Sequence, residues 1–263
     1  GIAGIELGDD ERQLRDWLAE GLYGSMTWMA QHGDKRSRPQ EPIPGTLRVI
    51  SVGLDYGRND SDDAWDTLGD GQRAYVARYA LGRDYHKLMR NRLQKLAERL
   101  QAEIGPFGHR VFVDSAPVLE RALARNAGLG WIGKHTCLID KDGGSWFFLG
   151  EIYVDLPLPL SAPVDAHCGS CTACIDICPT QAIVAPERLK AVMRADVARG
   201  TKRAEASWSL PVRMWKNVVR ARGRGLRPGW VPASSEAFGL VVLDAMLRGI
   251  PVLVSTAGAL AEA

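Results

Sequence analysis

The sequence predicts a fold of the α/β or α+β class. Segments rich in β-branched residues alternate along the chain with segments whose apolar residues recur at helical spacing. The 263 residues are 46% hydrophobic and 24% charged, which suffices for a buried core and excludes wholesale disorder. No apolar run approaches the ~18 residues of a membrane span, and the acidic first residues lack the pattern of a signal peptide.

The first part of the chain predicts one helix and one strand. Residues 10–22 form a helix because four apolar side chains share one face: Leu14, Trp17, Leu18 and Leu22. Residues 47–56 are rich in β-branched side chains and follow a Pro/Gly turn at 42–45, which predicts a strand.

The middle of the chain predicts a helix, a strand and a second helix. Residues 84–104 form a long amphipathic pattern. We expect its apolar face to carry Leu88, Leu93, Leu96, Leu100 and Ile104. Residues 109–114 predict a short strand, and residues 116–128 predict a helix with Pro117 in its first turn and Gly128 at its end.

Two further strands are predicted over 135–140 and 145–156, before a Pro-rich link over 157–165. Ahead of them, GLGWIG has the G-x-G-x-x-G spacing of dinucleotide sites, but a helix precedes it and a strand follows it. That order is the reverse of the dinucleotide-binding unit. We therefore expect these glycines to make a tight turn or to let the backbone approach a flat ligand.

Four cysteines, Cys168, Cys171, Cys174 and Cys178, have the spacing C-x2-C-x2-C-x3-C-P, which bacterial ferredoxins use for 4Fe–4S clusters. A structural zinc site usually takes two well-separated pairs, so iron is favoured. Either all four cysteines hold one cluster, or the site is only partly present and Cys178 is its weakest or missing ligand. Cys137 lies in a predicted strand, where a buried, inert thiol is expected. Such cysteine usage suits a reducing compartment, the cytoplasm.

The net charge of +2 conceals a basic segment. Residues 190–230 carry eleven Lys and Arg against two acidic residues, a net charge of +9, which leaves −7 for the rest of the chain. Such a segment could contact a phosphate backbone, or it could be a solvated helix face and loop. Both interpretations stay open on the sequence.

Four motifs together resemble epoxyqueuosine reductase: ARYALGRDYHKLMRNRL, VDSAPVLERALARNAGLGWIGKHTCLI, FFLGEIYVDLPLP and CGSCTACIDICPTQAIV. The resemblance covers about residues 1–188. It implies a cobalamin-binding reductase-type domain of sheet and helices, followed by a partial ferredoxin-like iron–sulfur module. The implied reaction reduces epoxyqueuosine to queuosine at the wobble position of tRNA. The implied cofactors are cobalamin and a 4Fe–4S cluster, and the implied partners are tRNA with a GUN anticodon and an external electron donor. We expect a monomer that binds no membrane.

The resemblance implies that Asp114 gives a proton to the departing epoxide oxygen, for which burial must raise its pKa. From the sequence alone, Asp114 or Ser115 would cap the following helix. The resemblance also implies corrin contacts from Arg36, Asp114, Leu138, Leu149 and Ile152. The three apolar members of that set equally suit a plain core. His86 and His135 are expected to be surface or supporting groups, since the family holds cobalamin without a protein histidine on the metal.

The resemblance ends near Pro186. We expect four segments: a reductase-like domain over 1–165, an iron–sulfur module over 166–188, a basic linker over 189–231 and a fragment over 232–263. The last segment resembles the nucleotide-sugar-binding end of a retaining glycosyltransferase, with Glu236 and Asp244 in the place of its paired glutamates. It equally suits an amphipathic helix followed by a buried strand. We expect a truncated, chimaeric chain with no transferase activity.

Two functions of other classes stay open on the sequence. One is a non-enzymatic, ferredoxin-like electron carrier, and the other is a glycosyltransferase fragment. Cobalamin binding separates the reductase from both, because neither needs a corrin cavity.

Overall fold

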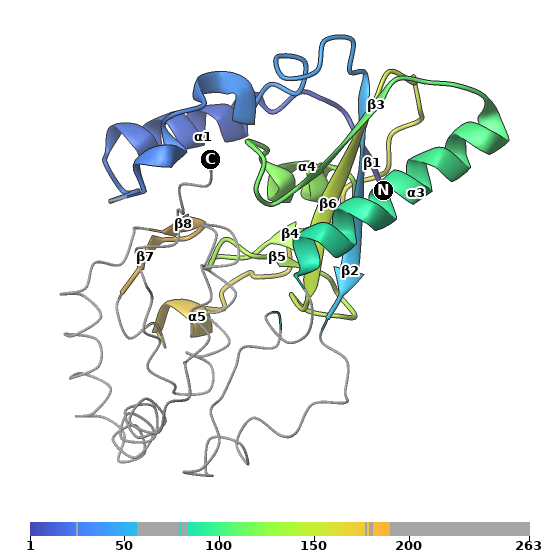
Figure 1. The fold of residues 1–263 in the computed structure, drawn as a ribbon. Helices are drawn as coiled ribbons and strands as arrows, with labels where there is room; N and C mark the ends of the chain where they lie inside the picture. Colours follow the sequence, from blue (N-terminus) through green and yellow to red (C-terminus); the bar gives the residue numbers. More distant parts are fainter. Residues whose placement is uncertain (25, 57–78, 80–83, 177, 179–180, 190–263) are drawn as a thin grey trace, which may run out of the picture.

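The computed structural model describes residues 1–24, 26–56, 79, 84–176, 178 and 181–189 (Figure 1). The predictions for the basic segment over 190–230 and for residues 232–263, Glu236 and Asp244 included, lie outside these ranges. Within the described ranges, no helix combines the length and the apolar character that crossing a bilayer requires.

A four-stranded antiparallel sheet forms the centre of the described structure (Figure 1). Its strands, in spatial order, are β1 (Ile2–Ala3), β2 (Arg48–Asp55), β6 (Phe147–Val154) and β3 (His109–Val113). The three longer strands confirm those predicted over 47–56, 109–114 and 145–156. Antiparallel pairing throughout selects the α+β alternative of the predicted fold class.

α3 (Tyr85–Ile104) covers one face of the sheet and confirms the helix predicted over 84–104. Its buried side chains are spaced four residues apart: Met89, Leu93 and Ala97. The predicted apolar face was wrong at Leu88 and Ile104, which are 41% and 59% exposed. The side that packs on the sheet is centred on the buried row, and these two residues lie outside it.

α4 (Glu120–Asn126) covers the opposite face, the one to which Tyr153 of β6 points, and is shorter than the helix predicted over 116–128. The chain enters α4 through a turn. Its N-cap residue is Leu119, and no side chain caps it. Helix capping therefore does not account for Asp114, which lies in the turn directly after β3.

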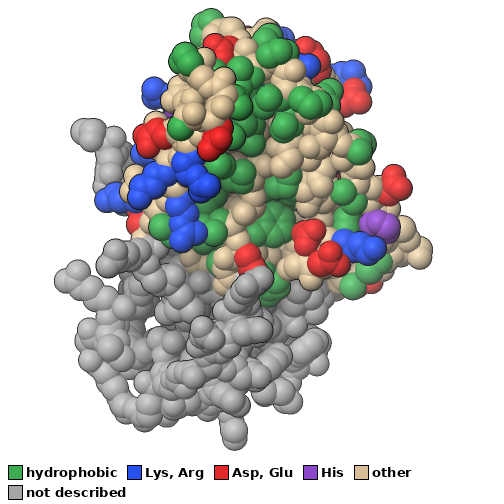
Figure 2. Space-filling model, turned by 90° about the vertical axis from the view of Figure 1, so that its right-hand side faces the viewer, with side chains coloured by type: hydrophobic (Ala, Val, Ile, Leu, Met, Phe, Trp, Pro, Cys, Tyr) green, Lys and Arg blue, Asp and Glu red, His purple; other side chains and the backbone are tan. Residues whose placement is uncertain are grey.

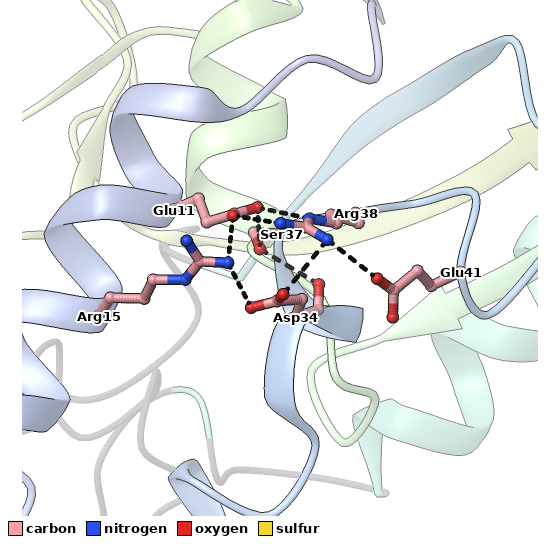
Figure 3. A network of polar contacts seen from close by, with 6 residues as sticks. All are labelled: Glu11, Arg15, Asp34, Ser37, Arg38 and Glu41. Atoms are coloured by element: carbon pink, nitrogen blue, oxygen red, sulfur yellow. Dashed lines mark hydrogen bonds and ion pairs between the residues drawn. The ribbon is translucent and has the colours of Figure 1, made fainter.

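The N-terminal segment contains α1 (Gly8–Ala19), η1 (Thr27–Met29) and η2 (Gly33–Arg36). A polar network joins α1 to the region of η2 (Figure 3). Glu11 accepts hydrogen bonds from Arg38 at 2.8 Å and from Ser37 at 2.8 Å. These bonds, with that from Arg38 the stronger, lower the pKa of Glu11 to about 2. The network fixes the segment that carries Arg36.

Small elements complete the described chain: the hairpin β4 (Trp131–Ile132) with β5 (Leu138–Ile139), α5 (Ala173–Asp176), and the hairpin β7 (Ile183–Ala185) with β8 (Arg188–Leu189). The strand predicted over 135–140 is thus reduced to two residues. Gly130 has φ +156°, and a Cβ atom there would lie 2.1 Å from the carbonyl oxygen of Ile139. This glycine lets two segments of the chain approach each other, as a tight turn requires.

Candidate active site

A pocket opens at the edge of the sheet where β2 and β3 end and β6 begins. β2 and β3 both run antiparallel to β6, so their carboxyl ends meet at this edge. The pocket has about 570 Å³ of free space, solvent at its mouth included. Its lining includes Tyr79, Tyr85, Asp114, Cys137, Leu138 and Leu149.

Asp114 is a buried carboxylate of this pocket, with a side chain only 6% exposed. The Tyr85 hydroxyl donates a hydrogen bond to its Oδ2, and Nε2 of His86 lies 3.5 Å from the same oxygen. Tyr85 and His86 belong to the first turn of α3. Asp84 caps this turn, since its carboxylate accepts the backbone N–H of His86 at 3.0 Å. The start of α3 therefore holds Asp114 in place.

His86 lies between two carboxylates. Its Nε2 faces Asp114, and its Nδ1 lies 2.9 Å from Oδ1 of Asp84. The interaction with Asp114, followed by that with Asp84, raises the pKa of His86, although partial burial opposes the shift. The side chain is 34% exposed. His86 thus lies between the buried carboxylate of Asp114 and solvent. Asp114 and Asp84 both favour the charged form of its imidazole.

Aromatic side chains cluster in the lining of the pocket. The rings of Tyr85 and Phe148 stack at 3.9 Å with an angle of 5° between their planes, and Tyr56 lies 4.5 Å from Phe148. The buried hydroxyl of Tyr79 has no hydrogen-bond partner within the described part of the chain. Burial, followed by the charge of Asp114, raises the pKa of Tyr79 to about 12. The pocket therefore offers apolar surface together with a protonated phenol, which is a hydrogen-bond donor for a ligand.

The pocket brings together three of the five residues predicted to contact a corrin: Asp114, Leu138 and Leu149. Ile152 is fully buried on the face that α3 covers. Arg36 is buried outside the lining: its guanidinium lies 5.4 Å from the ring centre of Trp28, and its carbonyl accepts the N–H of Leu119 at 3.1 Å. The cofactor-binding roles of these residues stay predictions.

Sequence reasoning did not single out Tyr79, Tyr85, Glu120 or Arg121, all of which line the pocket. A usable signal was present for Tyr85. It follows the N-cap residue Asp84 directly and precedes His86. Two adjacent rings with polar atoms in the first turn of a helix indicate side chains that can act together at one site. His86 was expected to be a surface or supporting group, and its position 3.5 Å from Asp114 makes it a supporting group.

The β4–β5 hairpin lies between the pocket and the cysteine segment, residues 167–178. On the pocket side, Cys137 is 3% exposed, and burial raises the pKa of its thiol to about 12. The prediction of a buried, inert thiol is thereby confirmed. On the other side, Nζ of Lys134 donates hydrogen bonds of 2.8 Å to the carbonyls of Gly169 and Cys171.

The four motif cysteines differ in burial. Cys171 is exposed, Cys168 and Cys174 are half-buried, and Cys178 is 5% exposed, with its Sγ accepting the N–H of Ala182 at 3.1 Å. Burial, together with the charges of Cys168 and Cys171, raises the pKa of Cys174. Among the described residues, no three His, Cys, Asp or Glu side chains are grouped closely enough to hold a metal ion as they stand. The donor set fits iron, because thiolates that repel one another are stabilised by a shared cation.

Comparison with protein families matches two parts of the chain. Residues 36–115 match the family described as "Epoxyqueuosine reductase QueG, DUF1730". Residues 167–213 match the "4Fe-4S double cluster binding domain". The first match contains Asp114 and α3, and the second contains all four motif cysteines.

Individual proteins agree with these matches. The epoxyqueuosine reductase of Xanthomonas campestris pv. campestris is 83% identical over 191 residues, which are 73% of this chain and 54% of that relative. An epoxyqueuosine reductase solved with an epoxyqueuosine-modified tRNA-Tyr stem loop is 26% identical, with a TM-score of 0.60 over 72% of this chain and 50% of that one. The Bacillus subtilis enzyme, solved with an aspartate-bearing catalytic loop swung out of its active site, gives 25% identity and a TM-score of 0.62 over the same shares. The chain spans about half the length of the curated relatives it matches, and the part that these comparisons cover belongs to the epoxyqueuosine reductase family.

Proposed function

We propose that this chain carries the active-site half of an epoxyqueuosine reductase, which reduces epoxyqueuosine to queuosine in tRNA. The observation that carries the proposal is the buried carboxylate of Asp114, which Tyr85 and His86 hold in the lining of a pocket rich in aromatic side chains. The 83% identity with a reductase over the same part of the chain supports it.

The proposed reaction requires two electrons and two protons. Both C–O bonds of the epoxide break, a C=C bond forms, and the oxygen leaves as water. The electrons come from an external one-electron donor. Asp114 supplies the proton that the departing oxygen needs, because it is a buried acidic group of the pocket that both Tyr85 and His86 hold in place. His86 returns a proton to Asp114 from solvent, since its ring contacts that carboxylate and is one-third exposed.

The pocket residues fit cobalamin as the group that lies beside Asp114. The aromatic cluster that includes Tyr85 and Phe148, together with the side chains of Leu138 and Leu149, offers apolar surface to a macrocycle. The Tyr79 hydroxyl offers a donor to its periphery. When bound, cobalamin would supply a strongly reducing metal centre, and the protein would supply orientation and the proton. The contacts predicted for Arg36 and Ile152 stay predictions, because both residues lie outside the pocket lining.

The cysteine segment fits a 4Fe–4S cluster, with Cys168, Cys171 and Cys174 as the proposed ligands and Cys178 as the weakest or missing one. The first three are accessible, whereas Cys178 is buried among Ala182 and Ile183. When bound, a cluster would pass electrons singly. We propose the division predicted from the sequence, a reductase domain over 1–165 and an iron–sulfur module over 166–188.

The proposed substrate is tRNA with a GUN anticodon, because a related reductase has been solved with an epoxyqueuosine-modified tRNA stem loop. We propose a monomer in the cytoplasm, where free thiols stay reduced. The external electron donor completes the list of partners.

Anaerobic reconstitution with iron, sulfide and cobalamin tests this function. We expect the visible and paramagnetic-resonance spectra of an iron–sulfur cluster and of bound cobalamin, followed by conversion of epoxyqueuosine in tRNA when a reductant is added. A cluster without cobalamin binding would indicate an electron carrier instead. Zinc without iron would contradict both functions.

A further inference from the structure

We propose that Lys134 is a positioning residue for the iron–sulfur segment: it holds the first cysteine loop against the β4–β5 hairpin and raises the reduction potential of the cluster. The proposal rests on the proposed function, because it requires a cluster on the motif cysteines. It concerns a residue that belongs to neither the pocket lining nor the cysteine motif.

Lys134 joins the hairpin to two parts of the iron–sulfur segment. Its ammonium donates hydrogen bonds of 2.8 Å to the carbonyl oxygens of Gly169 and Cys171, on the loop that carries the first two cysteines. Its own carbonyl accepts the N–H of Glu187 at 2.9 Å, in the turn between β7 and β8. Lys134 therefore contacts residues on both sides of α5 in the chain: Gly169 and Cys171 before it, and Glu187 after it.

The loop that Lys134 holds is a tight turn. The N–H of Cys171 donates to the carbonyl of Cys168 at 2.9 Å, and Gly169 has φ +44°. The Lys134 ammonium, shared by the carbonyls of Gly169 and Cys171, fixes the orientation of these two peptide groups, because charge-assisted hydrogen bonds are stronger than those between neutral groups. The positions of the first two cysteines then follow from that of Lys134.

The hairpin itself is anchored on the pocket side. Arg121 of α4 donates a hydrogen bond to the carbonyl of Thr136, and the N–H of Gly133 donates to the carbonyl of Cys137 at 2.8 Å. A Cβ atom on Gly133 would lie 2.7 Å from the side chain of Ile139, so the turn is closely packed. Lys134 thus extends from a hairpin that is held in place, and the hairpin determines how the cysteine segment lies relative to the pocket.

The charge of Lys134 acts on the cluster as well. Reduction adds an electron to a site already surrounded by thiolates. An ammonium held against the backbone of Cys171 favours the more negative, reduced state. Cluster potentials respond to local charge, hydrogen bonding and exposure in this way.

The test uses the full chain, reconstituted anaerobically with iron and sulfide, as wild type, Lys134→Met, Lys134→Gln and Lys134→Arg. Lys141→Met, an exposed lysine of the β5–β6 turn, is the matched control. The readouts are the midpoint potential from a paramagnetic-resonance redox titration and the iron retained against a chelator. We expect Lys134→Met to lower the potential and to weaken iron retention ~10- to 100-fold, the usual effect of losing an outer-sphere partner.

The other variants separate charge from hydrogen bonding. Lys134→Arg should keep the potential close to that of the wild type, whereas Lys134→Gln should retain more iron than Lys134→Met but share its lowered potential. A wild-type potential and wild-type iron retention in Lys134→Met would overturn the proposal, as would an equal shift in Lys134→Arg. Circular dichroism checks folding, and Lys134→Gln carries the test if Lys134→Met does not fold. None of the readouts uses tRNA, so the midpoint potential and the iron retention test the role of Lys134 even in a chain without reductase activity. Failure of the wild type to take up iron would contradict the proposed function itself.

Discussion

The pocket and the cysteine segment are built in different ways. The pocket lies between a sheet and two helices, and Asp114 is fixed there by hydrogen bonds from α3 while its walls are packed aromatic and apolar side chains. The cysteine segment has one four-residue helix, an exposed Cys171 and few buried apolar residues. The first is held by the hydrophobic core, whereas the second depends on contacts such as those of Lys134.

This difference indicates where each region obtains its stability. The pocket is organised by the burial of apolar and aromatic side chains. The cysteine segment needs the free energy of metal binding to bring its thiols together, because metal sites of this kind couple binding to folding. Changes in the pocket should therefore affect chemistry with little effect on iron, and changes among the cysteines should affect iron with little effect on the pocket.

The largest effect is expected for Asp114→Asn, tested in a chain that is active. The amide fills the same space in the pocket but cannot supply a proton. The rate of epoxyqueuosine reduction should fall ~10²- to 10⁴-fold, as is typical when a general acid is lost. Cobalamin affinity, measured by titration in visible light, should stay nearly unchanged.

Asn at position 114 also separates chemistry from structure. Iron content of this variant should match the wild type, and its free energy of unfolding should fall by no more than ~1 kcal/mol, because the amide can still accept the hydrogen bond from Tyr85 but loses the charge that faces His86. Lost folding with full activity per folded molecule would show that Asp114 is a structural residue.

The sequence predicted the fold better than the site. Elements with a strong local signal lie where the sequence predicted them: β2 and β6 from residue types that favour strands, and α3 from the helical spacing of its apolar residues. The residues around Asp114 were only partly predictable. Tyr85 and His86 meet Asp114 across 28 or more positions of the chain, a long-range contact that no local pattern encodes.

The proposed cysteine ligands could be predicted from the sequence, whereas the lysine that contacts their loop could not. The cysteine spacing predicted an iron–sulfur site directly, because the ligand geometry depends on short local gaps. Lys134, by contrast, has no local pattern that marks it. Its contacts with Gly169 and Cys171 join positions 35 and 37 residues apart, so only the structure shows them. Ile152 shows the converse: its apolar side chain in a predicted strand suited a plain core, but the sequence did not indicate which face of the sheet it occupies.

Thiol reactivity should also separate the two regions strongly. In the metal-free chain, Cys171 is exposed, whereas Cys137 is buried and its pKa is raised to about 12. At pH 8 the thiolate fraction of Cys137 should be ~1,000-fold below that of an ordinary thiol, since each pKa unit is a factor of ten. Time-resolved alkylation with peptide mass mapping should label Cys171 first and Cys137 last. Rapid labelling of Cys137 in the folded chain would show that the pocket wall opens.

A smaller contrast is expected within the cysteine motif. Cys174→Ser should lower iron affinity by at least the ~10- to 100-fold that loss of an outer-sphere partner costs, because a proposed ligand is removed. Cys178→Ser should retain more iron, because its sulfur is buried and accepts the N–H of Ala182. Iron per chain after chelator challenge measures both. Equal loss in the two variants would show that Cys178 is a full ligand, and two complete clusters per wild-type chain would contradict the proposed ligand set.

The smallest effect is expected for His86→Gln and concerns pH. The pKa of His86 is raised in the folded protein by Asp114 and then by Asp84, so the charged ring stabilises the fold. This stabilisation is fully present below the unfolded pKa of about 6.5 and is lost as the pH rises through the higher folded value. Because the ring is one-third exposed and solvent screens it, the contribution should not exceed ~1 kcal/mol.

The free energy of unfolding, from urea titrations of wild type and His86→Gln at pH 5.5, 7 and 9, measures this contribution. The wild type should be the more stable by the largest margin at pH 5.5, and the margin should shrink toward pH 9. Asp84→Asn is the matched control: it removes the weaker of the two favourable partners, so the pH dependence should decrease but persist, because Asp114 still faces Nε2. A margin that stays flat, or that grows with pH, would show that His86 is neutral in the folded chain and cannot return a proton to Asp114.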